Sequence, residues 1–155
     1  MAARDPSSSG AIRTRKPLGI QLILACGIYL VGLGGYFILV RPSMLPEDER
    51  FVGASLVALR SSAPGLEGWL QHVFGVLGGY MMATGALTLY TAITWPSPNR
   101  WPAVATLAFA GLSSVVAMSA VNFSLHSDFR WLLLVPAVIW IVGVALLATR
   151  REPPA

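Results

Sequence analysis

Four long apolar stretches without a charged side chain alternate with short polar segments along this chain. They occupy residues 17–40, 73–99, 101–127 and 131–149. A helix of about 20 apolar residues crosses the hydrocarbon of a bilayer, and a charged group at its centre costs about 2.5–3.5 kcal/mol on insertion scales. The pattern therefore predicts an all-α membrane protein, a four-transmembrane-helix bundle within residues 17–149. Its spans are expected at about 18–40, 70–95, 101–125 and 131–149.

The first connection between spans is the only one long enough to contain an element of its own. Pro46 followed by three acidic residues is typical of a first helical turn, because the helix dipole favours negative charge there. Apolar residues then recur at helical spacing, at Val52, Leu56 and Leu59, before Pro64 interrupts the pattern. We expect a short amphipathic interfacial helix at about 46–62, lying on the outer face of the membrane. This helix either carries function or caps the bundle.

Composition and charge agree with a membrane protein and do not indicate a nucleic-acid partner. The 155 residues are 55% hydrophobic and 12% charged, whereas a soluble domain has about 25% charged residues. The basic residues flank the spans and do not form the water-facing stripe that binds nucleic acid. Of the 11 Lys and Arg residues, seven lie on the side of the two termini and four on the other. The bias predicts a multi-pass protein of the bacterial inner (plasma) membrane with cytoplasmic N- and C-termini.

The two ends of the chain are predicted to be cytoplasmic tails. Residues 1–16 are rich in Pro, Ser and Gly with scattered charge, a composition that buries too little apolar surface to fold, so we expect a flexible tail. Residues 150–155 form the second tail. The apolar run after the first tail exceeds the 7–15 residues or so of a secretory signal, and we expect it to be retained as a span. Cys26 is the only cysteine, which excludes an intrachain disulfide.

Small residues recur every four positions in the second span, at Gly75, Gly79 and Ala83. This spacing places them on one helix face, where another helix backbone can approach closely. The pattern predicts a helix-packing seam. The partner is either another span of the same chain, which we favour, or a second chain.

One group of polar residues is predicted at the outer membrane face. Asn122 and His126 are four apart, so they share one face of the third helix near its outer end, and Asp128 follows in a tight turn. The topology brings His72, at the start of the second span, to the same face. Imidazole groups bind metals and titrate near neutral pH, so a metal, haem or proton-relay site is one interpretation. The alternative, which we favour, is that these residues meet water at the membrane interface and have a structural role.

No catalytic set is recognisable in the sequence, and no metal or cofactor is assigned. The H-E-x-x-H spacing of zinc proteases and the G-x-S-x-G of serine hydrolases are absent. We expect Ser113, Ser114 and Ser119 in the third span to form hydrogen bonds between helices. No carboxylate or basic residue lies at mid-membrane depth, where ion-coupled transporters generally place an ionisable group. Gln21, Thr84, Thr88 and Asn122 are the polar groups nearest the hydrocarbon, and binding of a lipid or quinone requires only an apolar groove with one or two polar anchors.

Three runs of the sequence, LPEDERFVG, GWLQHVFGVLGGY and VNFSLHSDFRWLLL, resemble those of small, uncharacterised bacterial inner-membrane proteins with four spans. The size and layout are also similar to DoxX-like membrane proteins, although no DoxX functional motif matches residue by residue. The resemblance implies a bundle fold and transfers no active site. The small-residue seam leads us to expect a non-enzymatic component of a homo-oligomer or larger membrane complex. Outer-face metal, haem or quinone binding and the binding or transport of a small lipophilic molecule are the alternatives.

Overall fold

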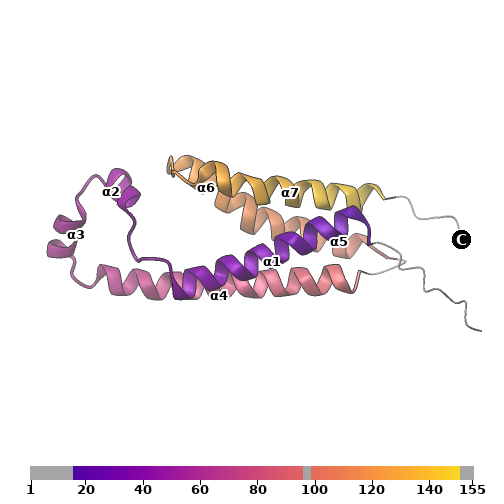
Figure 1. Ribbon diagram of the computed structural model, residues 1–155, viewed down its shortest axis with the longest axis horizontal. Helices are drawn as coiled ribbons and strands as arrows, with labels where there is room; N and C mark the ends of the chain where they lie inside the picture. Colours follow the sequence, from indigo (N-terminus) through magenta and orange to yellow (C-terminus); the bar gives the residue numbers. More distant parts are fainter. Residues whose placement is uncertain (1–15, 96–98, 151–155) are drawn as a thin grey trace, which may run out of the picture.

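The structure is a computed structural model, and it describes residues 16–95 and 99–150. The described chain is helical, with four long rods (Figure 1). Its elements are α1 (Leu18–Leu39), α2 (Pro46–Val52), α3 (Leu56–Ser62), α4 (Leu66–Ile93), α5 (Trp101–Gly111), the π-helical η1 (Leu112–Val116), α6 (Ala117–Ser124) and α7 (Arg130–Thr149). The predicted tails, apart from Lys16 and Arg150, lie outside the described residues.

Four helical rods are long and apolar enough to cross a membrane, as the sequence predicts. They are α1, α4, the continuous Trp101–Ser124 rod formed by α5, η1 and α6, and α7. Each begins and ends within four residues of its predicted bounds. The start of α1, the end of α4, the start of α5 and the end of α7 lie together at one end of the bundle (Figure 1). We call this the terminal end, and the opposite end, with α2, α3 and the α6–α7 turn, the loop end.

Helix α1 is the centre of the bundle and packs against both α4 and α7. The third rod packs mainly against α7, whereas α4 and α5 meet over only a few residues. The buried core follows this arrangement, with Ile23 and Leu30 of α1, Leu107 of α5 and Trp140 of α7 almost completely enclosed. The four rods therefore form an open bundle, with a gap in the ring between α4 and α5.

The third rod contains a turn of π-helix beside Trp140. The indole Nε1 of Trp140 donates a hydrogen bond to the main-chain carbonyl of Leu107 at 2.8 Å. Gly111 lies directly under the same ring, because a Cβ there would overlap the indole. A wide π-helical turn follows at Leu112–Val116.

Two of the serines in this rod do not form the interhelical hydrogen bonds expected of them. The Ser113 hydroxyl donates to the Phe109 carbonyl and the Ser114 hydroxyl to the Ala110 carbonyl, both in the same rod.

The predicted single helix at about 46–62 is two helices in the structure, separated at Gly53. Gly53 has φ 75°, a left-handed conformation that ends α2 and that glycine adopts without a Cβ penalty. The second helix has its own N-terminal caps: the Ser55 hydroxyl accepts from the Ala58 N–H, and the Glu49 carboxylate accepts from the Leu56 N–H at 2.7 Å. The apolar period continues through both helices and conceals this break.

Candidate functional site

The residues predicted to form an outer-face site lie at the loop end, where His72, Asn122 and His126 use their polar groups locally. His72 Nδ1 lies 2.6 Å from the Gly68 carbonyl, and His126 Nδ1 lies 3.1 Å from that of Ser124. The Asn122 amide donates to the Met118 carbonyl one turn earlier. Both imidazoles are exposed. Within residues 16–95 and 99–150, no three His, Cys, Asp or Glu side chains are close enough together to hold a metal ion.

Asp128 takes part in a different cluster, which fastens α2 to the α6–α7 turn. The Arg50 guanidinium lies 2.8 Å from the Asp128 carboxylate. Glu47 accepts hydrogen bonds from the buried Ser127 hydroxyl and from the Asp128 N–H at 3.1–3.2 Å. The ion pair and the hydrogen bonds to Glu47 join segments about 80 residues apart in sequence. We call Glu47, Arg50, Ser127 and Asp128 the loop clasp.

Two arginines complete the loop end. The guanidinium carbon of Arg41 lies 3.6 Å from the ring centre of Phe74 and 5.2 Å from that of Phe37, a cation–π arrangement. Partial burial lowers the pKa of Arg41, opposed by the negative charges of Asp48 and Glu47. Arg60 of α3 forms two hydrogen bonds to Glu67, which raise the pKa of Arg60. The loop end is thus a structural cap held by the Arg50–Asp128 and Arg60–Glu67 pairs and by the cation–π contacts of Arg41.

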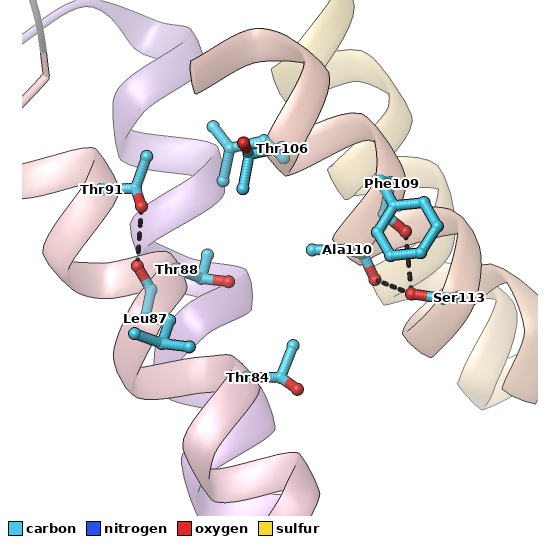
Figure 2. A pocket seen from close by; sticks show the side chains of 9 residues that line it. Thr84, Leu87, Thr88, Thr91, Thr106, Phe109, Ala110 and Ser113 are labelled. Atoms are coloured by element: carbon cyan, nitrogen blue, oxygen red, sulfur yellow. Dashed lines mark hydrogen bonds between the residues drawn. The ribbon is translucent and has the colours of Figure 1, made fainter. Parts of the chain in front are cut away.

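A groove of about 210 Å³ lies in the gap between α4 and α5. Its walls carry hydroxyl groups from both helices, with Phe109 and leucine side chains between them (Figure 2). The lining hydroxyls belong to Thr84, Thr88 and Thr91 on α4 and to Thr106 and Ser113 on α5 and η1. No charged side chain is in the lining. The groove can therefore hold a neutral, largely apolar group.

Thr88 differs from the other hydroxyl residues of this groove. Thr84, Thr91, Thr106 and Ser113 each donate a 2.8 Å hydrogen bond to the carbonyl four residues earlier. The Thr88 hydroxyl has no hydrogen-bond partner in the described part of the chain, although the residue is only 2% exposed. Figure 2 shows its oxygen on the side of α4 that faces α5. A hydroxyl that opens onto an apolar groove and has no partner among the described residues is free to donate a hydrogen bond to a ligand.

The sequence contains a signal for this groove. Thr84, Thr88 and Thr91 fall on one helix face, and Thr106 and Ser113 are seven apart on one face of the next helix. Thr84 and Thr88 are recognisable as polar groups inside the second span. Their meeting with α5 is not, because the spacing within one helix carries no information on which neighbour it faces.

The intrachain contact predicted at Gly75, Gly79 and Ala83 is not formed. A Cβ placed on Gly75 or Gly79 would have no atom within 4 Å, and Ala83 is exposed. The close approach to α1 is made instead by Gly78 and Gly85, on another face of α4. The predicted stripe lies on the outward face of α4, and its packing against a second chain stays a prediction.

The fold and its polar groups define a class: an all-helical protein with four helices able to span a membrane, capped at one end by two short helices. No protein-family model, curated protein or solved structure matches the chain. Function is therefore argued from the chain's own residues. They offer one exposed small-residue face on α4, one hydroxyl-lined groove and one charged cap.

Proposed function

We propose that the chain is a non-enzymatic, multi-pass protein of the bacterial inner membrane, with both termini in the cytoplasm, and that it is a component of a homo-oligomer or larger membrane complex. It associates through the outward face of α4, which carries Gly75, Gly79 and Ala83. The positive-inside bias supports the orientation. The similarity to DoxX-like proteins in size and layout agrees with the proposal but adds no site.

The observation that carries this proposal is the open small-residue face of α4. Within an apolar window of 18 residues in α4, only 17% is buried inside the protein. The corresponding buried share is 28% in each of the other three rods. Within hydrocarbon, helices associate through close backbone packing, which small residues allow. Gly78 and Gly85 already use this principle toward α1. The Gly75, Gly79 and Ala83 face offers a second, unoccupied surface of the same kind.

Tyr80 supports a protein partner for this face. It lies at the middle of α4, beside the small-residue stripe, and its side chain is 71% exposed. Its phenol hydroxyl has no hydrogen bond to any of the described residues. A phenol at mid-membrane depth cannot reach water, and a tyrosine hydroxyl removed from water usually finds a hydrogen-bond partner. An acceptor on a neighbouring helix would satisfy it.

A matched pair of substitutions tests the proposal. Gly79→Leu blocks close approach on α4, and Gly32→Leu adds the same bulk to α1, where a Cβ also meets nothing within 4 Å. We expect the native protein and the Gly32→Leu variant to be captured as oligomers, or with a co-purifying partner, by cross-linking in native lipid. Gly79→Leu should lose this association. A strictly monomeric native protein without a partner, or equal association of both variants, would contradict the proposal.

The alternative of a metal or haem redox protein receives no support from the loop end. It requires His72 and His126 in one site, and each ring is exposed beside a carbonyl of its own segment. Metal analysis and a visible absorption spectrum of the purified protein test it directly. A bound metal or chromophore that is lost on double alanine replacement of the histidines would favour this alternative.

A further inference from the structure

The geometry points to a binding site for a neutral, lipid-soluble carbonyl compound in the groove between α4 and α5, with the Thr88 hydroxyl as the hydrogen-bond donor. This site goes beyond the proposed association through α4, because it lies on a different face of that helix. The groove residues of α4 face α5, whereas its small-residue stripe of Gly75, Gly79 and Ala83 faces outward.

The position of the groove fits a ligand that enters from the bilayer. The four rods leave their ring open at this point, since α4 and α5 meet over few residues. Thr88 is five residues before the end of α4 at Ile93, which is about 7.5 Å along the helix axis. The anchor therefore lies inside the hydrocarbon, below the interfacial level marked by Trp95 and Trp101. Phospholipid ester groups lie nearer the surface, so a free lipophile suits this depth better.

The hydrogen-bonding pattern identifies the chemistry of the ligand. The other lining hydroxyls already donate to backbone carbonyls. Thr88 alone keeps its proton available, and it has no partner among the described residues. A carbonyl oxygen accepts one hydrogen bond from such a hydroxyl without needing a charge. An ionised head group would lack a counter-charge, because the lining contains no ionisable side chain.

The size of the groove limits what enters. Ligand pockets for whole drug-sized molecules measure about 300–1,000 Å³, and this groove measures about 210 Å³. It holds a single-ring head group or a comparable segment, and an attached alkyl chain would extend into the bilayer. The side chain of Phe109 lines the groove and can lie against such a ring (Figure 2).

Decyl-benzoquinone is a suitable probe, because it is neutral and carries ring carbonyls. Decylbenzene provides the matched compound without them. We expect native mass spectrometry of the protein in phosphatidylcholine nanodiscs to detect one bound quinone. Thr88→Val, which replaces the hydroxyl by a methyl group, should weaken its binding about three- to tenfold. Thr84→Val should change it less than twofold, because the Thr84 hydroxyl is already bonded to the Tyr80 carbonyl.

Ala110→Leu provides a second, steric variant, since it adds bulk to the groove wall. We expect it to abolish quinone binding while the elution volume and melting temperature of the protein stay within error of the native values. Equal quinone binding by the native protein and Thr88→Val, or equal binding of decylbenzene and decyl-benzoquinone, would overturn the site. Gly79→Leu should bind the quinone normally, which separates failure of this site from failure of the proposed association.

Discussion

Gly34 of α1 and Gly78 of α4 hold two membrane helices in backbone contact. A Cβ added to Gly34 would lie 2.5 Å from the Gly78 carbonyl oxygen, and one added to Gly78 would lie 2.6 Å from that of Gly34. Gly27 and Gly85 form a second close backbone contact between α1 and α4, seven residues away along both helices. The seven-residue interval keeps both pairs on one seam, which makes α1 and α4 the closest-packed part of the bundle.

Substitution at this seam should destabilise the bundle. We expect Gly34→Ala and Gly78→Ala each to lower the free energy of unfolding by about 1–3 kcal/mol, the usual cost of overpacking. Gly32→Ala and Gly35→Ala are the controls, because a Cβ meets nothing within 4 Å at either position. They should be neutral or stabilising by about 0.5–1 kcal/mol. Equilibrium unfolding in mixed micelles measures these differences, and equal effects at all four glycines would contradict the seam.

The contact of Trp140 with Gly111 should couple the third rod to α7. Gly111→Ala would overlap the indole, and Trp140→Phe would remove both volume and the hydrogen bond to the Leu107 carbonyl. We expect each change to cost about 2–4 kcal/mol. The double variant should cost less than the sum, because the smaller ring makes room for the added methyl group. Additive costs in the same unfolding assay would show that the two residues act independently.

The sequence predicts the rods of this fold because each is dictated locally. Charge-free length sets the four spans, and their observed bounds differ from the predicted ones by at most four residues. The apolar pattern does not predict the break at Gly53, although its signals are present: a glycine, then Ser55 three residues before the Ala58 N–H that it caps. The helical spacing of Val52, Leu56 and Leu59 continues across the break. The apolar pattern therefore favours one helix where the structure has two.

Which helix faces meet is not a local property. The second span contains two interleaved sets of small residues, and only one, with Gly78 and Gly85, is matched by glycines at the same seven-residue interval in α1. The regular four-residue spacing of Gly75 and Gly79 was the stronger pattern within one helix and lies on the outward face. The outer-face residues are likewise near one end of the bundle, but each histidine finds a backbone carbonyl close to itself in sequence.

Arg41 should contribute to the attachment of the loop end through its planar guanidinium. It stacks at 3.6 Å on the ring of Phe74, a geometry that a lysine ammonium does not reproduce. We expect Arg41→Lys to lower stability by about 0.5–1 kcal/mol and Arg41→Gln by about 1–2 kcal/mol. The comparison with Phe74→Leu completes the test, because Arg41→Lys should have no further effect in that background. An unchanged effect there would exclude the ring contact as the cause.

The loop clasp should control how tightly α2 is held. Ser127 is only 4% exposed, and its hydroxyl donates to the Glu47 carboxylate. Removing a buried hydrogen bond to a charged group costs about 1–3 kcal/mol. We therefore expect Ser127→Ala to increase amide hydrogen exchange in residues 46–52 about tenfold or more. Ser61→Ala, whose exposed hydroxyl bonds only to the Ala58 carbonyl, is the control and should leave exchange there unchanged.

Orientation can be measured with single cysteines, because the native Cys26 is only 2% exposed and should resist labelling. Ser61→Cys places an exposed thiol at the loop end, and Asn99→Cys places one at the terminal end. With cytoplasmic termini, a membrane-impermeant maleimide added to spheroplasts should label Ser61→Cys at once and Asn99→Cys only after permeabilisation. The unaltered chain reports any labelling of Cys26. The reverse pattern would show that the termini are outside, and labelling of both cysteines in intact spheroplasts would contradict a four-span topology.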